Sequence, residues 1–180
     1  MASIKLVPVL PASIDAIRSL AGPLQSEYGL PVEVDVAHAF GSDIAYNISR
    51  GQSNSSALLA ELLRLFPRHD GKLLGITAVD LFIPVLTFVF GEAQLNDRAS
   101  VASGCRLREE FYGMEANEEL FRQRLLKEAV HELGHTFGLL HCTNYDCAMH
   151  SSTSVDDIDI KGAHLCAECS ARIRRTAQPS

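Results

Sequence analysis

The sequence has no surplus of positive charge and no long hydrophobic run. Its 180 residues include 16 lysines and arginines against 22 aspartates and glutamates, which gives a net charge of −6. Because a negative field repels phosphate backbones and anionic lipids, we expect neither nucleic acid nor a membrane surface as a partner. The longest apolar run, LFIPVLTFVF at residues 81–90, contains Pro84 and is too short to cross a bilayer.

Secretion signals, internal repeats and low-complexity stretches are absent as well. The first residues lack the charged region, apolar stretch and small-residue cleavage site of a signal peptide, so we expect a cytoplasmic protein. With 47% hydrophobic and 21% charged residues, the chain is typical of a globular domain, and we expect a monomer. Thiols stay reduced in the cytoplasm, which favours metal binding by the five cysteines over disulfides.

Apolar periodicity predicts strands and helices in alternation, followed by strands in succession. Ser13 and Asn117 are placed to cap the first and third helices, and the third helix should continue to Gly138. We expect an α/β (α+β) fold with a mixed, mostly parallel, twisted sheet and an antiparallel edge strand. The expected strands are residues 4–10, 32–36, 71–83, 86–95 and 98–108, and the second helix lies within 53–66.

The third predicted helix carries the pattern H-E-x-x-H. His131 and His135 are four residues apart and therefore lie on one face, where both imidazoles can bind one metal ion. Glu132 lies beside that face and can take a proton from an activated water. Gly138 allows the chain to turn back and bring His141 to the same ion. Three protein ligands leave one position open for water, as in catalytic zinc sites.

Four cysteines form a second candidate metal site. Cys142 and Cys147 enclose four residues, Cys166 and Cys169 enclose two, and four thiolates suit a closed tetrahedral zinc site with a structural role. Two disulfides are the alternative in an oxidising compartment. Cys105 remains outside the set and is expected to be a small buried residue in the fifth strand.

The combined motifs resemble those of a known family. H-E-x-x-H-x-x-G-x-x-H followed by Met149 resembles the metzincin clan of zinc metallopeptidases, and the adjoining C-x4-C-x-M with the later C-x2-C resembles the archaemetzincins within that clan. The resemblance implies a metzincin-like zincin fold with a backing helix and an active-site helix. It also implies one domain over residues 1–180, divided into an N-terminal subdomain (1–138) and a zinc-stapled C-terminal subdomain (139–180).

The resemblance also implies roles for individual residues. His131, His135 and His141 would hold a catalytic zinc, and Glu132 would act as general base and acid. Met149 would form an apolar floor beneath the histidines without binding the metal. Residues 88–95 would be the edge strand to which an extended peptide adds. Two zinc ions per chain follow, the second held by Cys142, Cys147, Cys166 and Cys169.

The leading hypothesis is therefore a zinc-dependent peptidase acting on a peptide or protein substrate. Aminopeptidase action would need a carboxylate for the free amino group, for which Glu92, Glu109 and Glu110 are candidates, although salt bridging is their commoner use. Tyr145 is a candidate oxyanion donor or a plain loop tyrosine. The alternative is a zinc-stabilised peptide-binding or interaction module with a weakly occupied or inactive catalytic site. A nucleic-acid-binding zinc module is opposed by the acidic charge.

The remaining histidines and a basic cluster receive no function. The histidines outside the motif should be solvated or hydrogen-bonded. The basic cluster near the carboxyl end should be a solvated chain end. The histidines are His38, His69, His150 and His164, and the arginines are Arg172, Arg174 and Arg175.

Overall fold

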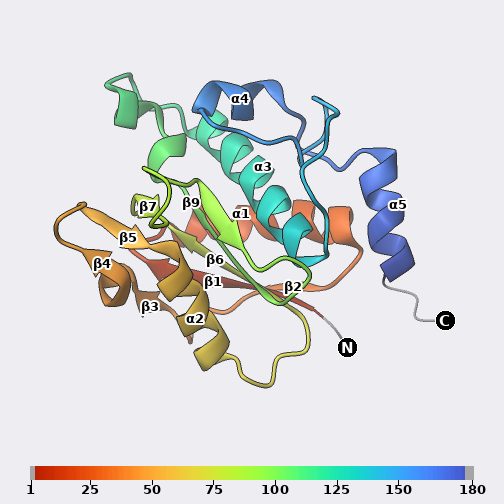
Figure 1. Cartoon of the computed structure of the whole chain (residues 1–180), viewed down its shortest axis with the longest axis horizontal. Coiled ribbons are helices and arrows are strands. Elements are labelled where there is room, and N and C mark those ends of the chain that lie inside the picture. The colour runs from red at the N-terminus through yellow and green to blue at the C-terminus, as the bar shows by residue number, and fades with distance from the viewer. Residues whose placement is uncertain (1–2, 177–180) are drawn as a thin grey trace.

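A central mixed sheet organises the computed structural model, which describes residues 3–176 (Figure 1). Its strand order is β2-β1-β6-β9-β8, and β3 also pairs with β1. The strands β2, β1, β6 and β9 are parallel, whereas β8 pairs with β9 in the antiparallel direction and forms one edge, as the sequence predicts. The bounds are β1 (Ile4–Leu10), β2 (Val32–Val34), β3 (Phe40–Gly41), β6 (Lys72–Thr77), β8 (Gly91–Ala93) and β9 (Ala99–Ser103).

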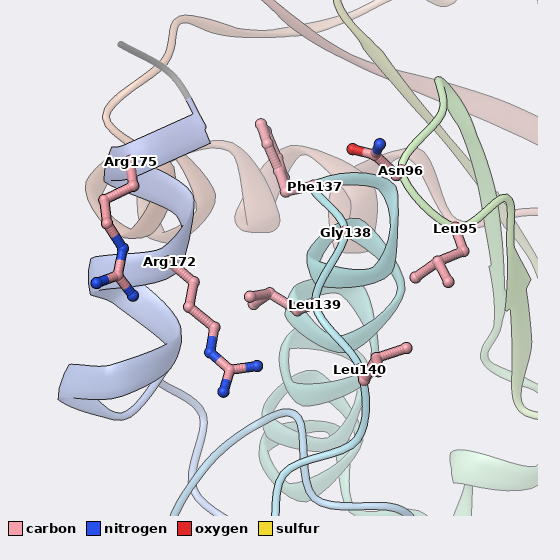
Figure 2. A pocket seen from close by; sticks show the side chains of 8 residues that line it. All are labelled: Leu95, Asn96, Phe137, Gly138, Leu139, Leu140, Arg172 and Arg175. Atoms are coloured by element: carbon pink, nitrogen blue, oxygen red, sulfur yellow. The ribbon is translucent and has the colours of Figure 1, made fainter. Parts of the chain in front are cut away.

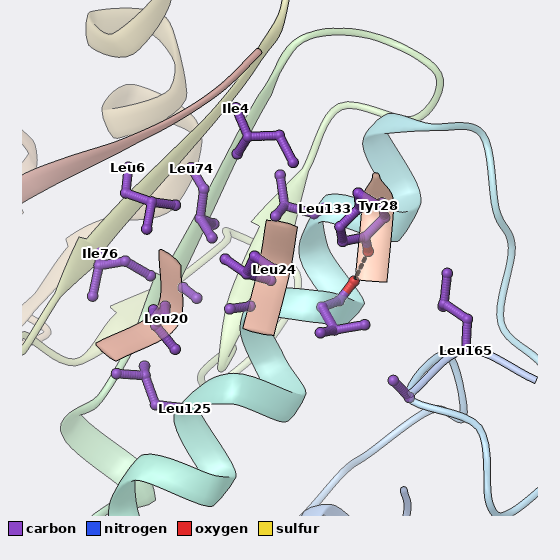
Figure 3. Packing of buried hydrophobic residues seen from close by; sticks show 14 of the residues in the cluster. Ile4, Leu6, Leu20, Leu24, Tyr28, Leu74, Ile76, Leu125, Leu133 and Leu165 are labelled. Carbon is purple, nitrogen blue, oxygen red and sulfur yellow. Dashed lines mark hydrogen bonds between the residues drawn. The ribbon is translucent and has the colours of Figure 1, made fainter. Parts of the chain in front are cut away.

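Helices cover both faces of the sheet because successive strand side chains point to opposite faces. Leu6 of β1 belongs to the cluster that packs on α1 (Ile14–Tyr28) and α3 (Glu118–Thr136), while its neighbour Val7 belongs to the cluster that packs on α2 (Ser55–Leu65). Figure 3 shows the first cluster, in which the Tyr28 hydroxyl also donates a 2.6 Å hydrogen bond to the carbonyl of Val130 on α3. The two long helices are therefore fixed to each other as well as to the sheet.

The predicted helix starts are confirmed by their caps. The Ser13 hydroxyl accepts a hydrogen bond from the backbone of Ala16 at 3.3 Å, and the Asn117 side chain accepts one from Leu120 at 3.0 Å. Each cap satisfies an amide that has no partner within the helix. The third helix ends before Gly138, whose φ of 85° is the left-handed conformation expected there.

Two strands are shorter than predicted. The second ends at Val34 because the Asp35 carboxylate accepts a hydrogen bond from the amide of His38, so the chain turns and leaves Val36 48% exposed. In residues 86–95 only Gly91–Ala93 form a strand. The carbonyls of Leu86 and Thr87 instead accept hydrogen bonds from the side chains of residues 50 and 52. These two carbonyls therefore bond to side chains and not to the backbone of a neighbouring strand.

The sequence also misplaced the ends of two other strands. The stretch 71–83 divides into β6 and β7 (Leu81–Phe82), and β7 belongs to a small second sheet with β4 (Tyr46–Asn47) and β5 (Gln52–Asn54). The fifth strand ends at Ser103, so Cys105 lies in the 3₁₀ turn η2 (Cys105–Leu107) and is only half-buried. Two further 3₁₀ turns are η1 (Ser42–Ala45) and η3 (Glu109–Tyr112).

The cysteine-rich segment contains two short helices that the sequence reading did not predict, α4 (Val155–Ile160) and α5 (Ala167–Thr176). Leu139, Ile158 and Leu165 join the hydrophobic cluster of α1 and α3. The segment therefore packs on α3 and extends the main core. Across residues 3–176, none of the helices combines the length and apolar character needed to cross a bilayer.

Candidate metal centre and active site

The three motif histidines converge at the end of α3. His131 and His135 are one helical turn apart, and the turn at Gly138 returns the chain so that His141 faces them. One ring nitrogen from each lies within 4.8 Å of the other two. The structure therefore brings together the three residues that the spacing selected.

Backbone carbonyls orient two of these rings. Nδ1 of His131 lies 2.8 Å from the oxygen of Ala148, and Nδ1 of His135 lies 2.8 Å from that of Leu139. A carbonyl oxygen only accepts, so each Nδ1 carries the proton and each Nε2 presents a lone pair. The two Nε2 atoms are 3.1 Å apart. The lone pairs of two nitrogens this close repel each other, and a cation bound by both nitrogens removes the repulsion. In a tetrahedral zinc site, bonds of 2.0–2.1 Å place two nitrogens about 3.3 Å apart.

Burial favours the neutral, metal-binding form of the rings. Loss of hydration lowers the pKa of His131 well below its ordinary value, and the positive charge of Lys161 lowers it further. Burial also lowers the pKa of His135 and of His141. All three rings therefore favour the unprotonated state that metal ligation requires.

Glu132 lies in the same cleft, under the edge strand. Burial raises the pKa of its carboxyl group well above the usual range, with a further rise from Glu128 and an opposing effect of Lys161. Gly91 of β8 lies directly against this side chain, because a Cβ at Gly91 would come within 2.6 Å of the Glu132 Cγ. Only glycine permits so close an approach between the strand and α3.

The cleft has a volume of about 670 Å³ and runs between β8 and the segment that follows the histidines. Residues 87–93 form one wall, and Ser151, Ser152 and Lys161 contribute to the other. Since β8 ends the path of the main sheet, its outer edge faces this space. An edge of this kind can accept an extended peptide as a further strand.

The four motif cysteines form the second cluster. Their sulfurs all lie within 4.8 Å of one another, and those of Cys142 and Cys166 are 3.9 Å apart. Zinc–sulfur bonds of 2.3 Å in tetrahedral geometry require about 3.8 Å between sulfurs. Each of the five cysteines is a free thiol in the structure. The donor chemistry and spacing of this cluster fit zinc.

Comparison with known proteins identifies the family. The model of peptidase family M54 matches residues 24–175. The archaemetzincin of Methanocaldococcus jannaschii is 44% identical over 130 residues, which cover 72% of this chain and 70% of that protein. The chain belongs to peptidase family M54, the archaemetzincins. These are zinc metallopeptidases.

Solved structures agree with this assignment. The archaemetzincin from Methanopyrus kandleri superposes with a TM-score of 0.84 at 32% identity, covering 99% of this chain and 96% of that one. A zinc-dependent peptidase from Methanocorpusculum labreanum gives a TM-score of 0.84 at 26% identity, covering 95% of this chain and 100% of that one. The predicted metzincin-like fold is therefore confirmed.

Met149, the methionine of the family motif, lies fully buried against α3. Its side chain occupies the space that a Cβ at Gly134 would need, one residue before His135. Its carbonyl accepts a 2.9 Å hydrogen bond from the amide of Cys142. The turn that contains Met149 therefore contacts both α3, which carries His131 and His135, and Cys142 at the start of the cysteine cluster.

The carboxylates considered for amine binding all have partners. The Glu92 side chain accepts hydrogen bonds from the hydroxyls of Ser55 and Ser56 at the start of α2. Glu109 pairs with Arg124 at 2.6 Å, and Glu110 lies 3.6 Å from Arg108.

Tyr145, the candidate oxyanion donor, is 66% exposed and packs on His150 with ring centroids 4.4 Å apart. His164 is an exposed residue whose ring lies 2.8 Å from the carboxylate of Glu27. His38 similarly lies 3.0 Å from Asp35. These positions agree with the structural uses considered from the sequence.

A buried ion pair in the cleft wall was missed by the sequence reading. Nζ of Lys161 lies 2.7 Å from Oε1 of Glu128, and the two side chains are 1% and 3% exposed. Glu128 is one turn before Glu132 on α3, so the helical spacing contained a usable signal for it. Lys161 follows α4, and no sequence pattern indicated its role, because its contact with Glu128 depends on how the C-terminal segment packs.

Proposed function

We propose that this protein is a zinc-dependent peptidase in which His131, His135 and His141 hold the catalytic ion and Glu132 serves as general base and acid. One observation carries the proposal. The Nε2 atoms of His131 and His135 lie 3.1 Å apart beside the buried carboxylate of Glu132, in a cleft bordered by a sheet edge. The family assignment supports the same chemistry.

A zinc ion held by His131, His135 and His141 would supply a Lewis acid for the scissile carbonyl and would lower the pKa of a bound water towards neutral pH. Glu132 accepts the proton from that water and delivers it to the leaving amine. The outer edge of β8 binds the substrate backbone as a further strand. The Met149 side chain packs against α3 at Gly134, next to His135.

The cysteine cluster would hold a second, structural zinc. Four thiolates complete a tetrahedral shell and leave no position for substrate. The ion would join Cys142 and Cys147, next to the methionine turn, to Cys166 and Cys169 at α5. We therefore expect two zinc ions per chain, and each contributes to folding because the unfolded chain has no preformed site.

Aminopeptidase action stays a prediction. It would need a carboxylate near the zinc site that can bind a free amino group. Glu109 and Glu110 are each paired with an arginine, whereas Glu92 lines the cleft and its partners are neutral hydroxyls, so Glu92 stays the candidate.

The proposal is tested by zinc content and cleavage measured on the same preparations. We expect about two zinc ions per chain and hydrolysis of a peptide library, with hydrolysis lost in Glu132→Gln while folding and zinc content are kept. The control is Glu119→Gln, at the exposed start of the same helix. Equal cleavage by Glu132→Gln would refute the mechanism. About one ion per chain without cleavage would favour the peptide-binding module.

A further inference from the structure

A second hollow, with a volume of about 470 Å³, lies beside the cleft. Leu95, Phe137, Leu139 and Leu140 give it apolar walls, and Arg172 and Arg175 of α5 line its other side. Figure 2 shows both arginine side chains extending from α5 on one side, with Leu95 and Leu140 across from them. Leu95 and Leu140 also line the catalytic cleft, so the hollow continues from it.

The hollow combines apolar walls with positive charge on a protein whose net charge is −6. Arg172 also pairs with Glu168 at 2.6 Å, and Arg175 adds a second guanidinium group to the same side of the hollow. Arginine binds carboxylates in a planar, two-pronged geometry. A glutamate or aspartate side chain fits this environment, because its methylene groups contact the leucines while its carboxylate meets the arginines.

The distance from the catalytic residues sets the position of that side chain. Gly91 lies against Glu132, and Leu95 is four residues further along the same segment. The chain is extended only over Gly91–Ala93 and turns at residues 95–96, so the strand rise of 3.3–3.4 Å per residue gives about 13 Å as the largest distance from Gly91 to the start of the hollow. Antiparallel addition to an edge is the more stable pairing, and it places the amino side of the peptide near Leu95.

We propose that this hollow is a specificity site for an acidic residue of the peptide substrate, about four residues before the scissile bond. The inference rests on the proposed function, which sets the direction of the peptide along β8 and the distance from Glu132 to the hollow. It gives a role to two of the three arginines that the sequence reading left as a solvated chain end. It also implies substrates that extend well to the amino side of the cleaved bond.

The first test compares fluorogenic peptides that differ only by glutamate or glutamine at that position. For the zinc-loaded protein we expect kcat/KM to be about fivefold higher for the glutamate peptide, the size expected of two partly exposed ion pairs. Arg172→Gln/Arg175→Gln should abolish the preference, and Arg175→Gln alone, further along α5 from the cysteines, should reduce it. Arg174→Gln is the matched control, since it removes the same charge from the same helix without lining the hollow.

A second readout keeps this inference separate from the proposed function. The Glu132→Gln protein should bind the fluorescently labelled glutamate peptide about fivefold more tightly than the glutamine peptide, with a difference that falls at high salt. Loss of that difference in the double arginine variant would support the hollow even if no peptide were cleaved. Cleavage without any preference, or an equal loss in Arg174→Gln, would overturn the inference and leave the peptidase proposal standing.

Discussion

The buried pair of Glu128 and Lys161 allows a strong stability prediction. Their charged atoms are 2.7 Å apart and their side chains are at most 3% exposed. Lys161→Met would remove the ammonium group and leave a buried carboxylate without its counter-ion, which costs about 3–5 kcal/mol in the free energy of unfolding. For a chain of this size that is a fall of roughly 6–20 °C in Tm.

Urea unfolding with zinc in excess measures the effect, because all variants then keep their metal. The double variant Glu128→Leu/Lys161→Met should recover most of the loss, since a buried pair replaced by apolar residues is often neutral. Glu118→Gln, which breaks the exposed pair with Arg108, should change stability by less than about 1 kcal/mol. A Lys161→Met cost below about 1 kcal/mol, or a double variant as unstable as the sum of its singles, would refute the reasoning.

Other predictions concern the two candidate metal sites. Gly91→Ala should push the Glu132 side chain aside and lower kcat/KM about a hundredfold, with zinc content unchanged by elemental analysis. Cys142→Ser should weaken zinc binding at the histidines roughly tenfold or more in a chelator competition, whereas Cys105→Ser should leave it unchanged. Tyr145→Phe should keep kcat within about twofold, because an exposed tyrosine packed on a neighbouring ring is a poor oxyanion donor; a loss near a hundredfold would restore that role. Complete zinc removal by a chelator should lower Tm by several degrees, measured by circular dichroism, and zinc should restore it.

The candidate site was predictable from the sequence because its ligands are close along the chain. His131 and His135 share one helical face, and a glycine turn is enough to return His141 to it. The cysteine cluster was predictable for a different reason: two closely spaced pairs of cysteines are the usual ligand pattern of a tetrahedral zinc site. Neither inference required knowledge of how distant segments pack.

The errors fall where tertiary contacts override local pattern. Residues 86–95 are apolar enough for a strand, yet the carbonyls of Leu86 and Thr87 bond to the side chains of Arg50 and Gln52, and only Gly91–Ala93 pair as a strand. The first short helix of the C-terminal segment had a readable start, since Ser154 and Asp157 form a capping box. The hollow lined by Arg172 could not be predicted, because it depends on where α5 packs.

The C-terminal segment orients the histidines as well as extending the core. It is fastened along one face of α3, where Arg124 binds Asp159 with two hydrogen bonds of 2.6–2.7 Å and Glu128 binds Lys161. One turn later the His131 ring donates to the carbonyl of Ala148, which follows Cys147 directly. A metal on the cysteines would therefore hold the carbonyl that fixes which nitrogen of His131 carries its proton. Loss of that metal should release the ring before it unfolds the helix, and for this reason we expect the two sites to be coupled.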